Sequence, residues 1–284
     1  MPAQSRPALW LDRIVQAKCR ELEQLRRSVP QTALEKSIVP RDRRIFCQAL
    51  LDAAEERGTA VIAEMKKASP SRGLLCASYD PVAIAQSYQA SGAAALSVLT
   101  DREFFSGSLE HLQRVKAATS LPVLRKDFTL APYHVYEAAA AGADAILLIA
   151  AILRPDELSS LLRLTHSLGM DALVEVHNAA ELEAALQAGG DCIGVNNRDL
   201  DILEVSLNTS LELIDTIPDT VVSVSESGIR SAEDLLSLRA AGFDAFLIGE
   251  RFMTEPDAGA ALRALLSGVA AKASENPATS RRAI

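Results

Sequence analysis

The sequence predicts an α/β protein built as a closed (βα)8 barrel, the TIM-barrel fold, with a helical extension before its first strand. Three observations predict this fold. Eight strand-like apolar runs alternate with eight helix-like runs after about residue 60. Several helical runs end in a small residue and a glycine that lead into the next strand, as at Ser91-Gly92 and Ala141-Gly142. Eight such units over about 210 residues fit a closed barrel better than an open, doubly wound sheet.

The extension consists of two predicted helices that precede any strand. Residues 8–27 carry apolar side chains at helical spacing on one side, whereas Lys18 and other charged residues mark the opposite, polar side. Pro30 ends this helix, because proline lacks the N–H group that a helix interior needs. Pro40 precedes a second helix at about 42–57, and Gly58 caps its end.

The barrel follows as a regular series of strands and helices. The predicted strands are Val61–Lys66, Ala95–Leu99, Val123–Lys126, Ala145–Ala150, Ala172–His177, Cys192–Val195, Val221–Ser225 and Ala245–Ile248. The predicted helices cover 80–91, 108–118, 132–141, 155–168, 178–188, 208–216, 231–240 and 257–271. Such alternation is typical of a parallel sheet with helices outside it. We expect a single domain, 1–284, with its extension at about 8–58, its barrel at about 60–270 and a polar tail at 272–284.

Composition argues against several classes of partner. The 284 residues carry a net charge of −8 and only 4% aromatic residues, so we expect neither nucleic-acid binding nor binding to an anionic membrane. The N-terminus lacks a signal-peptide pattern, and no apolar run is long enough to span a membrane. Four widely spaced cysteines without a CxxC pair are typical of free thiols in a reducing compartment. We therefore expect a cytoplasmic protein.

Motifs for metals and for nucleotide cofactors are also missing from the sequence. The four histidines are scattered, without HxH or HExxH spacing, so we expect no metal site. The pattern GxGxxG does not follow the first strand, and GxxxxGK[ST] does not occur. The dinucleotide-binding and P-loop interpretations are therefore unsupported.

The first strand carries the clearest candidate site. Glu64 and Lys66 are two residues apart, so both side chains point to the same face of a strand. The polar loop Ser69–Gly73 follows them directly. Two opposite charges on a buried face are costly unless they pair with each other or meet a ligand. The pair indicates either a small-molecule site beneath a flexible loop or a structural ion pair.

Polar residues also follow most of the other strands. In a (βα)8 barrel the carboxyl ends of the strands meet at one rim, where the active site lies. Seven of the eight predicted strand ends carry ionisable or amide groups, among them Glu64, Lys66, Lys126, Glu175, Asn196, Arg198, Ser227 and Glu250. Each could instead be a surface residue, a turn former or half of a structural ion pair, and His177 is better explained by a helix start than by catalysis. Their convergence on one rim favours a site.

Two glycines, Gly228 and Gly249, lie just beyond the last two strands. Loops at this position of (βα)8 barrels bind phosphate through backbone N–H groups and a helix N-terminus. Either glycine alone is equally well explained as a turn residue. Their joint occurrence favours a small phosphorylated substrate.

Eight segments carry a resemblance to a known family. They are Ile62–Gly73, Leu96–Asp101, Phe105–Leu109, Leu124–Phe128, Val174–His177, Ile193–Leu200, Ser225–Ile229 and Ile248–Glu250. In this order and spacing they resemble indole-3-glycerol-phosphate synthase over residues of about 8–268. The resemblance implies a cofactor-free (βα)8 carboxy-lyase of tryptophan biosynthesis. Such an enzyme closes the indole ring of 1-(2-carboxyphenylamino)-1-deoxyribulose 5-phosphate and releases carbon dioxide and water.

The resemblance also implies catalytic roles. Lys126 would be the general acid for ring closure, and Lys66 would be a second cation near the substrate, held by Glu64. Glu175 would transfer protons during dehydration. Asn196 would orient the sugar hydroxyls and the leaving hydroxyl.

Further residues are implied to bind the substrate. Ser227 is carried over as an active-site residue. Arg198 or Ser69 would receive the carboxylate, and Phe128 would pack the aromatic ring. The phosphate would be bound by Gly228, Gly249 and the backbone N–H of Glu250. Glu250 is an acid where some relatives have serine, so its carboxylate would repel phosphate.

Two other interpretations stay open on the sequence alone. One is a different phosphate-binding barrel, such as a sugar-phosphate isomerase or a Schiff-base aldolase that uses Lys66 or Lys126. The other is a catalytically silent barrel that serves as a binding subunit. In every case we expect a monomer or a weak homo-oligomer.

Overall fold

Eight parallel strands close into a barrel in the computed structural model, which describes residues 10–39 and 44–275. Their order around the barrel is β1-β10-β9-β8-β7-β6-β5-β4. Their bounds are Ala60–Met65 (β1), Ala95–Leu99 (β4), Val123–Lys126 (β5), Ala145–Ile149 (β6), Asp171–Val176 (β7), Cys192–Asn196 (β8), Val222–Glu226 (β9) and Ala245–Ile248 (β10). The predicted (βα)8 fold and its eight strands are confirmed, with strand ends shifted by at most one residue.

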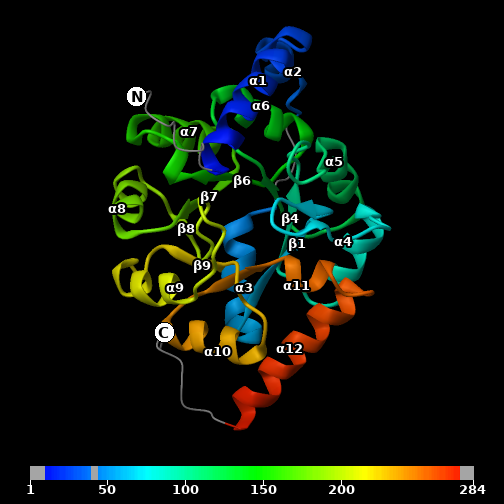
Figure 1. Cartoon of the computed structure of the whole chain (residues 1–284), viewed down its shortest axis with the longest axis vertical. Helices are drawn as coiled ribbons and strands as arrows, with labels where there is room; N and C mark the ends of the chain where they lie inside the picture. The colour runs from blue at the N-terminus through cyan, green and yellow to red at the C-terminus, as the bar shows by residue number, and fades with distance from the viewer. Residues whose placement is uncertain (1–9, 40–43, 276–284) are drawn as a thin grey trace, which may run out of the picture.

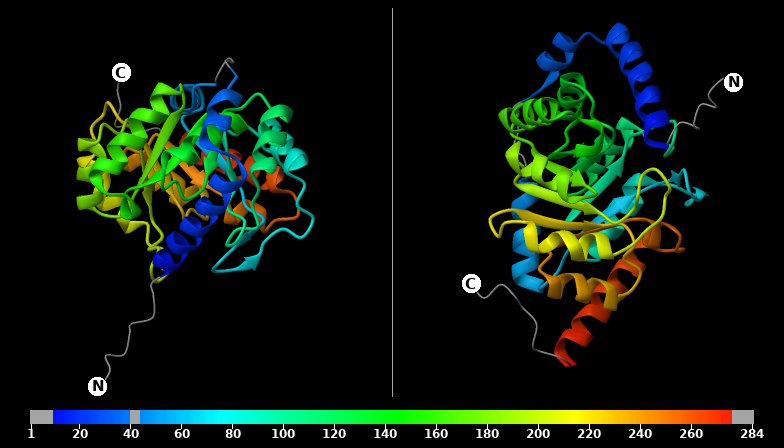
Figure 2. Two further views of the ribbon diagram at one scale, coloured as in Figure 1. Left: turned by 90° about the horizontal axis from the view of Figure 1, so that it is seen from above. Right: turned by 60° about the vertical axis from the view of Figure 1, so that its left-hand side comes forward.

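Helices cover the outside of the barrel (Figures 1 and 2). They are α4 (Pro81–Ala90), α5 (Leu109–Ala118), α6 (Pro132–Ala141), α7 (Pro155–Ser167), α8 (Ala179–Gln187), α9 (Asn208–Leu213), α10 (Ala232–Ala241) and α12 (Ala258–Glu275). Local sequence fixes several starts. The Asp80 side chain accepts from the backbone N–H groups of Val82 and Ala83 at the start of α4. Ser231 and Asp234 form a reciprocal capping box on α10. No described helix is long and apolar enough to cross a membrane.

The N-terminal extension contains three described helices rather than the two predicted. They are α1 (Trp10–Ser28), α2 (Gln31–Ser37) and α3 (Phe46–Arg57). Pro30 ends α1 as predicted, but its φ of −60° also suits the position before a helix, so α2 begins directly after it. In Figure 1, α1 and α2 lie at the end of the molecule opposite α12.

Other differences from the predictions are local. The loop after β1 forms a two-stranded ladder of β2 (Ala68–Ser69) with β3 (Gly73–Leu74), and the four-residue helix α11 (Glu250–Met253) follows β10. Helix α12 continues to Glu275. The predicted helix starts at 8 and 42, and most of the polar tail, lie outside the described residues. Lys18 lies on the polar side of α1, but its side chain is only 3% exposed, because carboxylates and not solvent surround it.

Alternate residues of each strand point into the barrel and form its inner core. Ile62 of β1 and Leu173 of β7 belong to this inner cluster, together with Phe46 and Leu50 of α3. The intervening residues, such as Val61 and Val174, pack outward against the helices. Helix α3 therefore closes the amino-terminal mouth of the barrel, and the N–H of Cys47 is held there by Asp171 Oδ2 at 2.9 Å.

The same period of two explains why charged side chains reach the interior at the carboxyl ends of the strands. Glu64 follows Ile62 by two residues, and Glu175 follows Leu173 by two. Lys126, Asn196 and Glu226 occupy the equivalent positions at the ends of β5, β8 and β9. The barrel is thus apolar in the middle and charged at one rim.

Candidate active site

A cavity of about 340 Å³ lies at the carboxyl ends of the strands. Eleven of the twelve predicted site residues line it: Glu64, Lys66, Lys126, Phe128, Glu175, Asn196, Arg198, Ser227, Gly228, Gly249 and Glu250. Ser69 instead lines an adjoining cavity of about 80 Å³, which Trp10 of α1 and Phe128 also border. The fold therefore brings the predicted residues to one rim from six different strands and their loops.

Glu64 and Lys66 form the ion pair that their spacing suggested. Lys66 Nζ donates to Glu64 Oε1 at 2.7 Å. Burial works against ionisation of Glu64, but the ammonium groups of Lys66 and Lys126 lower the pKa of this carboxyl below its ordinary value. Gly249 makes room for it, because a Cβ at that position would stand 2.6 Å from Glu64 Oε1. Gly249, one of the two glycines predicted to bind phosphate, therefore also leaves space for the side chain of Glu64.

Lys126 stands between two buried carboxylates. Its Nζ lies 3.1 Å from Glu175 Oε2 and 3.3 Å from Glu226 Oε2. Burial alone would lower the pKa of Lys126, but Glu175, Glu226 and Glu64 together raise it above its ordinary value. Lys126 is thus held as an ammonium ion between the carboxylates of Glu175 and Glu226.

The sequence analysis gave Glu226 no role, although the structure places it beside Lys126. It is 1% exposed, and its two carboxylate oxygens have no hydrogen-bond partner among the described residues. Burial, with repulsion from Glu175 and Glu64, outweighs the attraction of Lys126 and raises the pKa of Glu226 to about 7. The signal that could have found it is the inward series Val222, Val224 and Glu226, which the predicted strand end at Ser225 cut short.

Asn196, at the end of the neighbouring strand β8, and His177, directly after β7 itself, orient Glu175. Asn196 Nδ2 donates to Glu175 Oε1 at 3.1 Å. His177 Nε2 lies 3.4 Å from that same oxygen, and His177 Nδ1 lies 3.0 Å from Glu181 Oε2. Burial opposes protonation of the ring, yet the two carboxylates raise the pKa of His177 to about 10. His177 does stand before α8, as predicted, but it also belongs to the charge network of the site.

Side chains of the protein itself engage the carboxylates of the site. Within 10–39 and 44–275, no group of three or more His, Cys, Asp or Glu residues is arranged to hold a metal. The carboxylates of Glu64 and Glu175 are instead engaged by lysine, asparagine and histidine side chains. The arrangement offers a ligand ammonium groups that can donate protons and carboxylates that can accept them. Such paired donors and acceptors are what general acid–base catalysis requires.

Comparison with known proteins decides which family this site belongs to. The family model described as indole-3-glycerol phosphate synthase matches residues 11–265. The chain belongs to this family. Two relatives bear the same name: one from Carboxydothermus hydrogenoformans is 46% identical over 264 residues, covering 91% of this chain and 100% of its own. The other, from Chlorobium chlorochromatii, is 48% identical over 241 residues, which cover 85% of this chain and 94% of the relative.

Solved structures outside the indole-3-glycerol phosphate synthase family share the fold alone. The tryptophan synthase alpha subunit of Legionella pneumophila has a TM-score of 0.58 at 15% identity, covering 82% of this chain and 99% of that one. The protein KGPDC from Streptococcus mutans has a TM-score of 0.57 at 11% identity, and the match covers 75% of this chain and 98% of that one. At such low identity these likenesses establish the barrel and nothing about the chemistry.

Within this member of the indole-3-glycerol phosphate synthase family, the backbone turns sharply after β9. Ser227 has a φ of 66° and Gly228 a φ of 83°, so two successive residues adopt the left-handed conformation. A Cβ at Gly228 would also stand 2.7 Å from Val205 Cγ1. Asn197 Nδ2 fixes the turn by donating to the carbonyl of Ser227 at 3.1 Å. A non-glycine residue held in this conformation is frequent at functional sites.

Glu250 is neutralised by two arginines. Arg72 Nε lies 3.1 Å from Glu250 Oε1, and Arg198 Nη2 lies 3.3 Å from Glu250 Oε2. Arg72 belongs to the turn between β2 and β3, so Glu250 ties the loop after β1 to the end of the neighbouring strand β10. The carboxylate of Glu250 is thus paired with cations beside the predicted phosphate position.

Proposed function

We propose that this chain converts 1-(2-carboxyphenylamino)-1-deoxyribulose 5-phosphate into indole-3-glycerol phosphate, carbon dioxide and water, as its family name indicates. The observation that carries the proposal is the buried ammonium of Lys126 between Glu175 and Glu226. It lies in one cavity with Lys66 and the apolar side chain of Phe128. This combination suits a substrate with an aromatic ring, a ketone and two anionic groups.

Ring closure is assigned to Lys126 as general acid. The ring carbon that bears the carboxylate attacks the ketone at the second sugar carbon, and negative charge builds on the ketone oxygen. A proton donated to that oxygen stabilises the transition state. What supports Lys126 in this role is its protonated state in a buried cavity. Lys66, held by Glu64, supplies a second positive charge near the same oxygen or the substrate carboxylate.

Decarboxylation then restores the aromatic ring, and dehydration completes the indole. Loss of the hydroxyl group needs an acid to protonate it and a base to remove a proton from the newly closed five-membered ring. Glu175 is assigned to this proton transfer, and its hydrogen bond from Asn196 supports a fixed orientation. Glu226 is assigned to return a proton to Lys126, which its pKa of about 7 and its 3.3 Å separation from Lys126 support.

Substrate binding is assigned to the outer part of the cavity. Phe128 and the end of β6, Leu147 and Ile149, offer an apolar wall for the aryl ring. Arg198 or Ser69 is assigned to the carboxylate. The phosphate is assigned to Gly228, Gly249 and the backbone N–H of Glu250, because (βα)8 barrels bind phosphate after their last two strands.

Indole fluorescence during incubation with this substrate tests the assignment directly. Lys126→Ala and Glu175→Gln should each lower kcat by roughly 10²–10⁴-fold, the usual contribution of a general acid or base. Circular dichroism should show an intact fold. The control is Lys272→Ala, which breaks an exposed pair with Glu233 on the outside of the barrel and should keep full activity. Near-normal rates in both site variants would refute the assigned roles.

A Schiff-base aldolase is the competing enzyme class for a barrel with buried lysines. Such a lysine must be neutral to attack a carbonyl, which calls for a lowered pKa. The pKa of Lys126 is raised instead. Borohydride added with substrate should therefore leave Lys66 and Lys126 unlabelled in mass spectra. Covalent labelling of either lysine would favour the aldolase.

Cellular location and assembly complete the proposal. The four cysteines, Cys19, Cys47, Cys76 and Cys192, are all free thiols, which supports a reducing, cytoplasmic compartment. We expect a monomer or a weak homo-oligomer in solution. Sedimentation velocity over a range of protein concentrations tests this expectation, and a stable oligomer at the lowest concentration would contradict it.

A further inference from the structure

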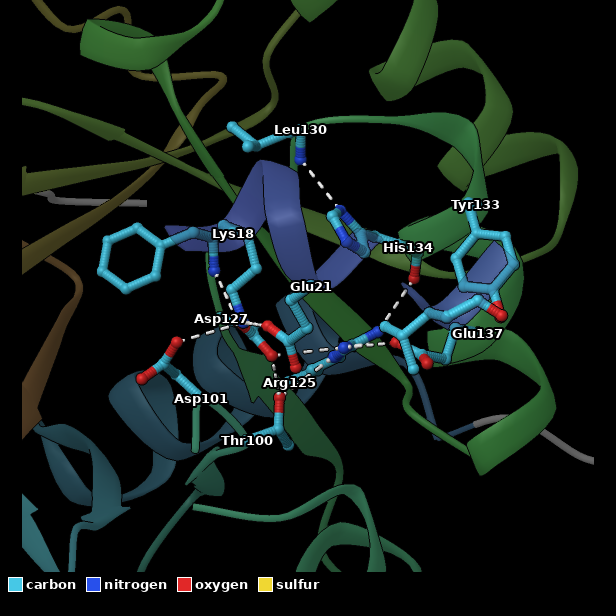
Figure 3. Close-up of polar contacts among 12 residues, drawn as sticks. Lys18, Glu21, Thr100, Asp101, Arg125, Asp127, Leu130, Tyr133, His134 and Glu137 are labelled. Carbon is cyan, nitrogen blue, oxygen red and sulfur yellow. Dashed lines mark hydrogen bonds and ion pairs between the residues drawn. The ribbon is translucent and has the colours of Figure 1, made fainter. Parts of the chain in front are cut away.

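A second network of charges lies beside the site and involves the N-terminal extension. Lys18 of α1 is buried, and its Nζ lies 2.7 Å from Asp127 Oδ1 and 3.0 Å from Asp101 Oδ2. Its third partner is Glu21 Oε2 at 2.6 Å, one turn further along α1. Figure 3 shows Lys18 pointing from α1 toward the two aspartates, which come from the ends of two neighbouring barrel strands.

Each aspartate fixes the backbone of its own loop. Asp101 follows β4, and its Oδ1 accepts the N–H of Phe104 at 2.8 Å. Asp127 follows β5; its Oδ1 accepts the N–H of Phe128 at 2.8 Å, and its Oδ2 accepts from Thr100 Oγ1 and Arg125 Nη2. Lys18 is therefore the described cation that pairs with both aspartates, whereas Arg125 pairs with Asp127 and reaches the end of β4 only through Thr100 Oγ1, to which its Nε donates at 3.1 Å.

Both loops contribute aromatic rings to the wall of the cavity. Phe105 and Phe128 line it, and their ring centroids are 6.3 Å apart. Trp10, at the start of α1, packs edge-on against Phe104 with ring centroids 6.2 Å apart. The ion pairs of Lys18 and the stacking of Trp10 thus dock the same helix onto the same two loops.

We propose that Lys18 is a positioning residue that holds the Phe105–Phe128 wall in place for the aromatic ring of the substrate. This inference rests on the proposed function, because it assumes a substrate with an aryl group. Lys126 keeps Glu175 and Glu226 as partners whether or not Lys18 is present. Loss of Lys18 should therefore weaken substrate binding and leave the chemical step unchanged.

Charge balance explains why a lysine stands at this position. Burial opposes ionisation of Asp127, but Arg125 and Lys18 lower the pKa of its carboxyl well below its ordinary value. Arg125 has Glu137 as a further partner at 2.6 Å. Without Lys18, Asp127 would keep Arg125, whereas Asp101 would remain buried without a described cation. A buried carboxylate of that kind either takes up a proton or draws water, and both rearrange its loop.

The first test is steady-state kinetics of Lys18→Met, which keeps a long side chain and removes the charge. KM should rise by roughly tenfold and kcat should stay near that of the wild type, as expected when uniform binding is lost. The substrate-free variant should also show a red-shifted emission from Trp10, the single tryptophan of the chain, because α1 is loosened. This second readout does not depend on the identity of the substrate.

The matched control is Lys116→Met. Lys116 also pairs with a buried aspartate, Asp144, but its side chain, 12% exposed, lies at the opposite, amino-terminal rim. A purely structural effect would lower Tm in both variants and change KM in neither. If Lys18→Met does not fold, Lys18→Met/Asp101→Asn removes one charge of each sign and should show the same rise in KM.

Two outcomes would overturn the proposal. One is a wild-type KM in the folded Lys18 variant, with or without a shift in Trp10 emission, and the other is a clear fall in kcat. Failure of the proposed function would look different, because the wild-type chain itself would then not form indole-3-glycerol phosphate. In that event the red shift of Trp10 would still report whether Lys18 docks α1.

Discussion

Three buried glutamates share the space around one ammonium group in the site. Glu64, Glu175 and Glu226 all face Lys126, and burial strengthens the repulsion among them. Glu64 and Glu175 have further polar partners, whereas Glu226 has no hydrogen bond among the described residues. Of the three carboxyls, that of Glu226 is therefore the one with a pKa raised to about 7, whereas the pKa values of Glu64 and Glu175 are lowered.

Glu226 should make the stability of the fold depend on pH. Its folded pKa of about 7 exceeds the ordinary value of 4.5, so the folded state binds more protons than the unfolded chain between these values. The free energy of unfolding should fall on the order of 2 kcal/mol as pH rises through this window. Denaturation of wild type and Glu226→Gln at several pH values measures it. Equal slopes in both proteins would contradict the assignment of the proton to Glu226.

Gly194 of β8 should be intolerant of a methyl group. A Cβ at this position would overlap the carboxylate of Glu226. Gly194→Ala should therefore destabilise the fold by roughly 1–3 kcal/mol, as overpacking does, and lower kcat by displacing Glu226. Gly268→Ala in α12 is the control, because its Cβ would meet Ala232 Cβ at 3.4 Å and alanine favours a helix. Thermal denaturation and the fluorescence assay compare the two variants, and equal effects would refute the overlap.

Single residues were predicted where they share a strand face with apolar neighbours. Glu64 and Lys66 were found because their spacing matches a strand, and the structure pairs them. The partners of Lys18 could not be predicted, because a helical pattern separates polar from apolar sides without indicating what the polar side faces. Here that side meets Asp101 and Asp127 instead of water. Such a contact between distant segments is not encoded in local periodicity.

At the scale of elements, the extension covers both ends of the barrel. Helix α1 lies over the carboxyl rim through Lys18, and α3 closes the amino-terminal mouth with Phe46 and Leu50. The two helices therefore serve different purposes. Helix α1 contacts the loops of the site, and helix α3 completes the core at the amino-terminal end of the barrel.

Leu50 and its neighbour Leu51 offer a sharp comparison within α3. Leu50 is fully buried, whereas Leu51 is 36% exposed. Leu50→Ala should cost about 2–5 kcal/mol of unfolding free energy through the lost burial and the cavity left behind. Leu51→Ala should cost less than half of that. Urea denaturation measures both, and KM should be unchanged in both because α3 lies at the rim opposite the site.

Long elements were predicted well and short ones were not. The strands were recognised because runs such as Ala145–Ile149 are apolar on both faces and follow a helix that ends in a small residue and a glycine, here Ala141-Gly142. Helices α2 and α11 were missed, since seven and four residues carry too little periodicity to be recognised. Such short helices form because the surrounding fold holds them, and α2 packs beside α6 in the structure.

At the scale of the whole molecule, the two rims of the barrel have separate tasks. The carboxyl rim holds Lys126 with its carboxylates, and the amino-terminal rim holds ion pairs such as Lys116 with Asp144. The single-domain interpretation of 1–284 stays a prediction. It implies that binding at one rim stabilises the entire chain.

Ligand-linked stability tests that implication. Indole-3-glycerol phosphate at about 100 times its Kd should add about 2.7 kcal/mol to the unfolding free energy, which corresponds to a rise in Tm of roughly 5–10 °C. Calorimetry should show the whole transition moving together. In Gly228→Ala the shift should shrink, because a Cβ there would stand 2.7 Å from Val205 Cγ1. A part of the transition that does not move would indicate a second domain.

The two-residue alternation of the strands also limits how the length of this chain can change during evolution. Deleting one residue between Leu173 and Glu175 would reverse every later side chain of β7, sending Glu175 into the helical layer and Val176 into the mouth. A substitution alters one side chain, whereas deletion of a single codon inside a strand moves every later side chain of that strand to the opposite face. Insertions and deletions are therefore tolerated only in the turns between strands and helices.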